Sequence, residues 1–301
     1  MTECLFRLRL PTGATGLARG DTAAGPVALL PSELTLEGLL RRGPEALLDA
    51  IRGRGARSAI PPEAALLAPL DAQEVWGAGV TYLRSRDARM EESQSDASVY
   101  DRVYGAARPE LFFKAPAWRV RGPGQEVGIR ADSQWNVPEP ELALVVTPAL
   151  SIAGYTIGND VSSRSIEGEN PLYLPQAKIY DASCALGPGI VPAALVAPPF
   201  PIHLAVLREG TAVLDAETTT SRMTRSLEEL VEHAGRALTF PSGLALLTGT
   251  GIVPEPSFTL EEGDVVRIEA GALGVLENPV VTVGRPAPEA SRAGKASPGA
   301  P

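Results

Sequence analysis

Short apolar runs separated by Gly, Pro and Asp follow one another through the chain beyond residue 73. Runs of this kind predict β-strands, here at 74–80, 111–115, 141–146, 154–161, 202–210, 211–216, 244–250 and 264–270. One helix interrupts them, where Ser226 and Glu229 form a capping-box pattern before an apolar stretch. Many short strands with few helices predict a β-rich α+β fold, a mixed roll or barrel, rather than a doubly wound sheet.

The beginning of the chain has a different pattern. Residues 4–10 alternate like an edge strand, and residues 34–55 place apolar side chains at helical spacing, with a break near Gly43 and Pro44. Residues 59–73 then read as a linker. These features predict a small N-terminal domain ahead of the main body of strands.

The end of the chain differs again. Residues 286–301 hold no apolar residue larger than alanine apart from proline, which predicts a disordered tail. We therefore expect a small N-terminal domain at 1–70, a main domain at 71–285 and a tail at 286–301.

Composition removes several function classes. The 27 basic and 36 acidic residues give a net charge of −9, which argues against nucleic acid or an anionic membrane as the main partner. An uncharged stretch at 190–207 contains four prolines, so we expect a loop and strand there rather than a membrane span. Only Cys4 and Cys184 are cysteines, which fits a protein of the reducing cytoplasm without a disulfide framework.

Familiar catalytic motifs are missing from the sequence. His203 and His233 are the only histidines, and no HExxH, GxGxxG, GxxxxGK[ST] or GxSxG pattern occurs. Histidine-rich zinc sites, dinucleotide-binding turns, P-loops and hydrolase elbows are therefore excluded by sequence.

Three acids mark one end of two neighbouring strand candidates. Glu139 and Glu141 stand two residues apart, so an extended backbone turns both to one face. Asp160 ends the next strand along the chain. Either this end is solvated and Asp160 caps a turn, or the three carboxylates hold a hard cation such as Mg²⁺, Mn²⁺ or Ca²⁺.

Three other charged residues have two readings each. Lys178 lies in a segment poor in charge, where a lysine serves either as an electrophile or as a surface partner of Asp181. Glu110 precedes Phe112 and Phe113, so it is either an acid that holds a proton near neutrality or an exposed strand start. Lys114, just beyond these phenylalanines, has the same ambiguity between a functional residue and a plain salt-bridge partner, and the salt bridge is the favoured reading.

Seven segments occur in an order that resembles the fumarylacetoacetate hydrolase family: VWGAGVTY, RPELFFKAP, PEPELALVV, GYTIGNDVSSRSIE, QAKIYDASCALGP, LLTGTGIVP and LEEGDVVRIEAGALGVLENPV. They extend from about residue 75 to 280. The resemblance implies a catalytic domain at 71–285 that binds Mg²⁺ through Glu139, Glu141 and Asp160, and a homodimer. It also implies a 2-oxo acid substrate, with Lys178 beside the keto oxygen and Thr250 beside the carboxylate.

The sequence departs from the family's C–C hydrolases in the run GVTYLRSRDA. Thr81 stands where those enzymes have asparagine, Ser85 where they have the water-activating histidine, and Ala88 where they have glutamate. The segments VYDRVYGAARPELFFKA and ENPLYLPQAKIY instead resemble the branch of 2-keto-3-deoxy-D-arabinonate dehydratases, which implies that Glu110 transfers protons. A polar span from Tyr82 to Arg108 reads as a helical lid.

The residues and the resemblance together predict a hydro-lyase that converts a small 2-keto-3-deoxy sugar acid to 2,5-dioxopentanoate and water. Glu110 and Lys178 are its expected catalytic residues. Tyr82, Ser85 and Thr250, with Lys178, are its expected substrate contacts, and Arg84 and Arg86 are further lid candidates. The alternatives are a C–C hydrolase of an acylpyruvate or diketo sugar acid, a metal-free dehydratase that forms a Schiff base on Lys178, and a non-catalytic binding protein.

Overall fold

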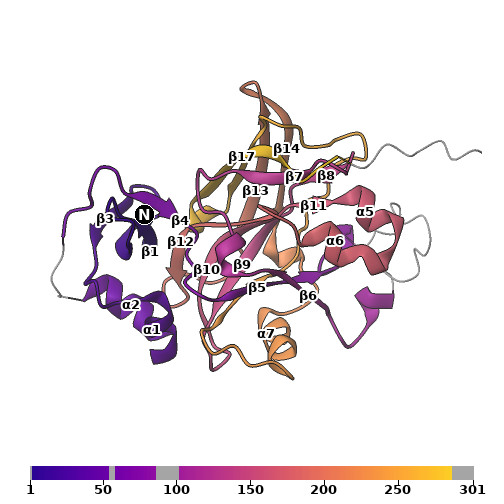
Figure 1. Ribbon diagram of the computed structural model, residues 1–301. Coiled ribbons are helices and arrows are strands. Elements are labelled where there is room, and N and C mark those ends of the chain that lie inside the picture. The colour runs from indigo at the N-terminus through magenta and orange to yellow at the C-terminus, as the bar shows by residue number, and fades with distance from the viewer. Residues whose placement is uncertain (1, 54–57, 86–101, 287–301) are drawn as a thin grey trace, which may run out of the picture.

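The computed structural model of the protein describes residues 2–53, 58–85 and 102–286 (Figure 1). All of the predicted tail at 286–301 except residue 286, and most of the predicted lid at 82–108, therefore lie outside the described residues.

The larger sheet forms the centre of the molecule, in the strand order β3-β2-β1-β12-β10-β9-β15-β5-β6 with β4 beside β1. Its central strands are β12 (Cys184–Pro192), β10 (Ile152–Asp160), β9 (Pro140–Val146), β15 (Leu244–Leu247), β5 (Glu74–Gly79) and β6 (Glu110–Ala115). Strands β9, β12 and β15 are buried at every position. This explains why the predicted strands β9 and β15 read as apolar runs rather than alternating ones, whereas β12 was not predicted. β9 and β10 form an antiparallel hairpin, as the short connection between them predicts.

A second sheet packs beside the first, in the order β14-β13-β16-β17-β7. Its strands are β14 (Thr211–Thr219), β13 (Pro201–Arg208), β16 (Val265–Glu269), β17 (Val275–Val283) and β7 (Val127–Arg130). A two-stranded ribbon, β8 (Asn136–Val137) with β11 (Ser162–Ser163), lies near the end of β10. The β-rich α+β fold is confirmed. The strand order of the described residues is open, however, so the molecule is not a closed barrel.

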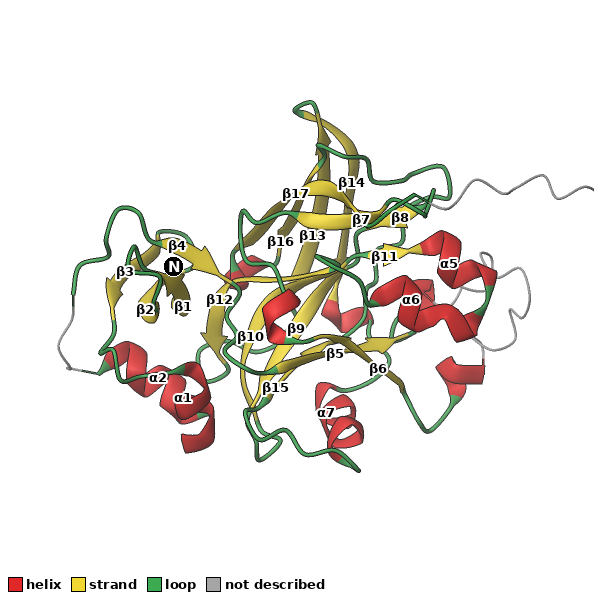
Figure 2. Cartoon of the chain, in the orientation of Figure 1, coloured by secondary structure: helices red, strands yellow, loops and turns green. Residues whose placement is uncertain are grey.

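Short helices accompany the sheets, and α5 (Arg164–Glu169) and α6 (Leu174–Lys178) lie side by side in Figure 2. Further short helices are α7 (Leu227–Gly235), η1 (Ala117–Arg119), η2 (Pro171–Tyr173), η3 (Thr220–Arg222) and η4 (Gly271–Leu273). Ser226 caps α7 as predicted, since its Oγ accepts from the Glu229 N–H at 3.1 Å. No helix in the described ranges is both long enough and apolar enough to cross a membrane.

The N-terminal unit contains β1 (Glu3–Arg9), β2 (Thr15–Asp21), β3 (Gly25–Leu29), β4 (Ala65–Leu67), α1 (Leu36–Arg42) and α2 (Glu45–Arg52). The helical break near Gly43 is confirmed, because this glycine ends α1 with a φ of 108°. Two predictions were wrong. β1 is not an edge strand, since it pairs with β2, β4 and β12, and the predicted linker contains β4. Through the β1–β12 pairing, the N-terminal unit extends the central sheet (Figure 1).

Candidate active site

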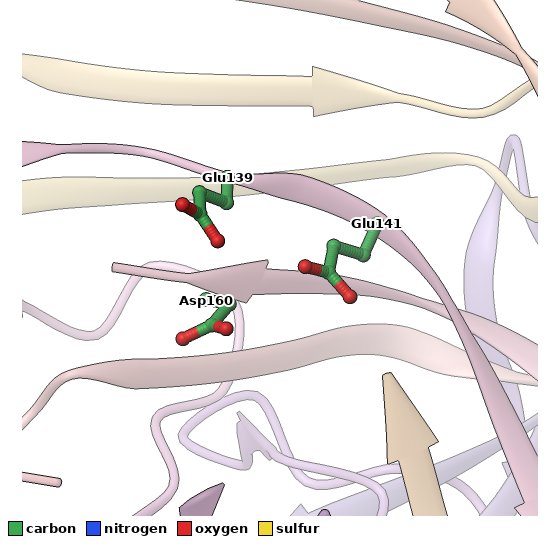
Figure 3. A group of neighbouring side chains, drawn as sticks. All are labelled: Glu139, Glu141 and Asp160. Atoms are coloured by element: carbon green, nitrogen blue, oxygen red, sulfur yellow. The ribbon is translucent and has the colours of Figure 1, made fainter. Parts of the chain in front are cut away.

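The three acids predicted as a cluster meet where β9 begins and β10 ends. Glu141 lies on β9 opposite Gly158, Glu139 directly precedes β9, and Asp160 is the last residue of β10. Each residue offers a carboxylate oxygen within 4.8 Å of the others, and the three side chains share one space in Figure 3. All three residues are at most 2% exposed, so the reading of a solvated strand end is wrong.

Lys178 contributes a positive charge to this cluster from the end of α6. Its Nζ donates to Glu139 Oε2 at 2.6 Å, to Asp160 Oδ2 at 3.0 Å and to Ser162 Oγ at 2.7 Å. The lysine is 3% exposed. The surface pairing with Asp181 is wrong, because Asp181 is 75% exposed and pairs with Arg119.

One oxygen of each acid is fixed from outside the cluster. Arg164 Nη2 lies 2.7 Å from Glu139 Oε1, and Lys114 Nζ lies 2.5 Å from Asp160 Oδ1. The Gly249 N–H donates to Glu141 Oε2 at 2.6 Å. These contacts hold the carboxylates in place while the remaining oxygens of Glu139 and Asp160 face Lys178.

The electrostatic balance differs between the acids. Burial raises the pKa of Glu141, and the charges of Asp160 and Glu139 raise it further, although Lys178 and the Gly249 N–H oppose them. Burial would also raise the pKa of Asp160, but Lys114 and Lys178 outweigh burial and hold it below its ordinary value. Glu141 is thus the carboxylate that the protein's own cations compensate least. A divalent cation would supply that compensation, and three carboxylates are a hard-oxygen donor set, so the site fits Mg²⁺.

A cavity opens beside the acid cluster, and its wall includes Glu110, Ser85, Glu167, Lys178 and Thr250. The structure therefore brings together four residues that the sequence singled out, together with the three acids. Among the described residues that line this cavity there is no histidine. His203 lies on β13, where it contacts Asp215 at 3.1 Å.

Two glycines on β5 make room for residues of β6. A Cβ placed on Gly79 would lie 2.2 Å from Glu110 Oε2, and one on Gly77 would lie 2.6 Å from the Phe112 ring. Gly79 and Glu110 are register partners in the β5–β6 pairing. The carboxyl group of Glu110 can therefore rest on the backbone of β5 at the cavity wall only because residue 79 lacks a side chain.

The start of the predicted lid has a structural role next to this cavity. Tyr82 is 1% exposed, and a Cβ on Gly251 would lie 2.7 Å from its ring. Tyr82 is not among the cavity-lining residues, so its substrate contact stays a prediction. Ser85 Oγ donates to the Tyr82 carbonyl at 2.8 Å, and Thr81 Oγ1 donates to the Thr248 carbonyl at 2.7 Å.

The remaining lid candidates have different outcomes. Arg84 is a surface residue with its Nη2 3.9 Å from Glu255. Arg86 and Ala88 lie outside the described residues.

Sequence reasoning missed two buried residues beside the acid cluster, Arg164 and the cavity-lining Glu167, and underrated a third, Lys114. Arg164 and Glu167 lie on α5 three residues apart, with Nη1 and Oε2 at 3.4 Å, and are 2% and 5% exposed. Their spacing directly after the Asp160 strand is a signal for one helical face. Lys114 was read as an ordinary salt-bridge partner, yet its side chain is fully buried.

The family comparison covers the part of the chain that contains these site residues. The family model for the fumarylacetoacetate hydrolase C-terminal domain matches residues 74–281. A probable 2-keto-3-deoxyxylonate dehydratase of Haloferax volcanii is 51% identical over 217 residues, which are 71% of this chain and 74% of the relative. The 2-dehydro-3-deoxy-D-arabinonate dehydratase of Saccharolobus solfataricus is 42% identical over 217 residues, 70% of this chain and 73% of the relative.

A solved structure shows a similar architecture. The structure of 2-keto-3-deoxy-D-arabinonate dehydratase complexed with magnesium and 2,5-dioxopentanoate covers 93% of this chain and 99% of its own, at 33% identity and a TM-score of 0.80. The match of the family model and the two similar dehydratases establish that the chain belongs to the fumarylacetoacetate hydrolase family.

Proposed function

We propose that the protein is a metal-dependent dehydratase of a 2-keto-3-deoxy sugar acid, with 2-dehydro-3-deoxy-D-arabinonate as substrate and 2,5-dioxopentanoate as product. The observation that carries this proposal is the cavity in which Glu110 and Lys178 lie beside three buried carboxylates. The two dehydratases that are 51% and 42% identical to this chain support the reaction class.

Mg²⁺ is the proposed ion, with Glu139, Glu141 and Asp160 as its ligands. When bound there, it would act as a Lewis acid toward the oxygens of a 2-oxo acid and make the C3 protons more acidic. The dehydratase structure that contains magnesium and 2,5-dioxopentanoate supports this choice of ion. Mn²⁺ and Ca²⁺ share its preference for oxygen ligands, so they are the ions to compare with it.

Proton transfer is assigned to Glu110. Its carboxylate accepts a proton from C3 of the substrate, and its carboxyl group then protonates the C4 hydroxyl as the C4–O bond breaks and water leaves. A double bond forms between C3 and C4. A proton then moves from C5 to C3 to give the C4–C5 enol, and transfer of the enol hydroxyl proton to C4 gives the aldehyde of 2,5-dioxopentanoate. General acid–base help of this kind is typically worth about 10²–10⁴ in rate.

Lys178 is assigned to the substrate keto oxygen. Its ammonium already lies among Glu139, Asp160 and Ser162, so it can donate a hydrogen bond at this place without leaving the cavity. Ser85 and Thr250 line the same cavity and are proposed to contact the substrate hydroxyls and carboxylate, respectively. Tyr82 is proposed as a substrate contact as well.

The assembly and location are also proposals. We propose a homodimer that works in the cytoplasm, on the strength of the family resemblance and of two free cysteines that are both buried. Light scattering of the purified protein tests the dimer directly, and a monomer mass would contradict it.

Product analysis tests the function. The protein is incubated with a panel of 2-keto-3-deoxy pentonates and hexonates, with and without EDTA, and the products are measured by mass spectrometry. We expect a product lighter by one water that forms only with divalent metal. A pair of shorter acids would indicate C–C hydrolysis instead.

Two further outcomes separate the remaining alternatives. Water loss that is insensitive to EDTA, together with borohydride trapping of substrate on Lys178, would indicate a Schiff base and contradict the metal mechanism. A His203→Ala variant is the matched control, because this histidine is not among the residues that line the cavity and its side chain is 41% exposed, so its loss should leave the rate unchanged.

A further inference from the structure

A fully buried lysine stands behind the acid cluster, and the proposed reaction does not use it. Lys114 lies on β6 between Phe113 and Ala115, and its residue is 0% exposed. Its Nζ lies 2.5 Å from Asp160 Oδ1, and it donates to the Lys178 carbonyl at 2.6 Å and to the Val161 carbonyl at 3.0 Å. The ammonium group thus makes two hydrogen bonds to backbone carbonyls and an ion pair with Asp160.

Asp160 lies between two buried lysines that hold different oxygens. Lys114 holds Oδ1 from behind, whereas Lys178 contacts Oδ2 from the cavity side at 3.0 Å. Lys178 lines the cavity and Lys114 does not. Oδ2 is therefore the Asp160 oxygen on the cavity side, where it contacts Lys178, and Lys114 fixes which oxygen that is.

The Lys114 ammonium group contacts both Asp160 of the proposed metal site and the backbone of Lys178, which is proposed to contact the substrate. Lys114 donates one hydrogen bond to the Lys178 carbonyl at the end of α6 and another to the carbonyl of Val161, the residue after Asp160. These bonds hold both segments in place. Ser183 Oγ donates to the same Lys178 carbonyl at 2.9 Å. One side chain from β6 thus sets the position of Asp160 relative to Lys178.

Stability alone does not explain a charge in this place. Taking an ammonium and a carboxylate out of water costs several kcal/mol per ion, and apolar replacements of buried ion pairs are often neutral or stabilising. Partners that hold metal ligands from outside, by contrast, typically change metal affinity about 10–100-fold when they are mutated.

We propose that Lys114 is a positioning residue of the metal site, which presents Asp160 Oδ2 to the ion and keeps Lys178 beside it. The proposal rests on the proposed metal-dependent function and deepens it. Lys114 acts through Asp160 and Lys178 and touches neither the ion nor the substrate.

The test compares Mg²⁺ binding with stability. Lys114→Met keeps an unbranched side chain that is one atom shorter and removes the charge. The EDTA-treated protein is titrated with Mg²⁺ in a calorimeter. We expect Mg²⁺ affinity to fall about 10–100-fold. A Mg²⁺ affinity within about twofold of the wild type would overturn the proposal.

A matched control separates positioning from folding. Gln73 is also 0% exposed, but it lies before β5, at the opposite end of that strand from Gly79, and it bonds to the Asp71 N–H at 2.7 Å and the Ser242 carbonyl at 2.8 Å. Gln73→Met should lower the Tm while Mg²⁺ affinity stays unchanged. A purely structural role for Lys114 predicts this same result for Lys114→Met.

A second measurement uses the wild-type protein and needs no variant. In a crystal structure with Mg²⁺, we expect Asp160 to bind the ion through Oδ2 while Oδ1 stays on Lys114. Binding through Oδ1, or release of Lys114 from Asp160, would overturn the proposal even if Lys114→Met fails to fold. Because neither measurement uses a substrate, failure of the dehydration reaction would be seen separately.

Discussion

The N-terminal unit and the cavity end of the central sheet differ in whether their charged side chains lie at the surface or are buried. In the N-terminal unit, the helices bury Leu36, Leu39 and Leu47 against β1, β2 and β12, and the pair between Arg52 and Glu3 lies at the surface. At the cavity end, seven charged residues are at most 5% exposed: Lys114, Glu139, Glu141, Asp160, Arg164, Glu167 and Lys178. The first region is built for stability, whereas the second retains charges whose burial costs stability and which therefore point to chemistry.

The largest expected effect is on catalysis at the cavity end. Glu110→Gln should lower the dehydration rate about 10²–10⁴-fold, because the amide can neither accept the C3 proton nor return it. Mg²⁺ affinity should be unchanged, since Glu110 is not one of the three clustered acids. Single-turnover kinetics and calorimetry measure the two quantities, and wild-type turnover would remove Glu110 from the mechanism.

Breaking a buried ion pair at the cavity should rank next. Arg164→Gln leaves Glu139 Oε1 without the guanidinium that now lies 2.7 Å away. Removing one partner of a buried pair costs about 3–5 kcal/mol, so the free energy of unfolding should fall by about that much. Urea denaturation without metal measures it. A loss below about 1 kcal/mol would mean that this pair behaves like a surface pair.

A core substitution in the N-terminal unit should destabilise the protein without a catalytic effect. Leu47 is fully buried in α2, and Leu47→Ala should cost about 2–5 kcal/mol through lost apolar contact and the cavity that remains. The rate per folded molecule should stay at the wild-type value. A lower rate in fully folded protein would show that the two regions are coupled.

The surface pair of the N-terminal unit should have a much smaller effect. Arg52 and Glu3 contact at 2.6 Å with side chains 56% and 40% exposed, where water screens the attraction. Arg52→Ala should leave the Tm unchanged within the error of a calorimetric scan. A drop as large as that of Leu47→Ala would contradict the division between the two regions.

The smallest effect concerns the two cysteines, one in each region. Burial raises the pKa of Cys184 to about 12, and burial also raises that of Cys4. Neither folded thiol should react measurably with a disulfide reagent at pH 8, because the thiolate is the reactive form. Both should react after unfolding in guanidinium. Rapid reaction of either one in the folded protein would indicate local opening of its strand.

The acid cluster could be predicted because its geometry is local. Glu139 and Glu141 share a face by strand alternation, and the short connection to β10 brings Asp160 beside them. Lys114 and Arg164 escaped prediction because their partners depend on the pairing of strands and helices distant in sequence. Lysine is also almost never fully buried unless it is paired, so the sequence alone favours a surface position for Lys114.

In the fold, too, local features could be predicted and features that depend on distant partners could not. Strand periodicity identified β5, β6, β9, β10 and β13 to β16, and the break at Gly43 separated α1 from α2, whereas β2, β7, β12 and β17 were not predicted. The family resemblance is confirmed by a family model over residues 74–281. The error at β1 arose from its partner, since Leu5 pairs with Ile190 far along the chain. No local pattern in residues 4–10 carries that information.

The pairing of Leu5 with Ile190 also has a consequence for synthesis in the cell. At about 5–20 residues per second, β12 leaves the ribosome on the order of 10–40 s after β1. Until then the part of β1 around Leu5 offers unpaired N–H and C=O groups, because β4 pairs only with Arg7 to Arg9. Charged side chains on an edge strand counter the pairing with other chains that such groups permit. Glu3, Arg7 and Arg9 lie along β1. These charged side chains therefore protect the strand from pairing with other chains during the time in which its edge is unpaired.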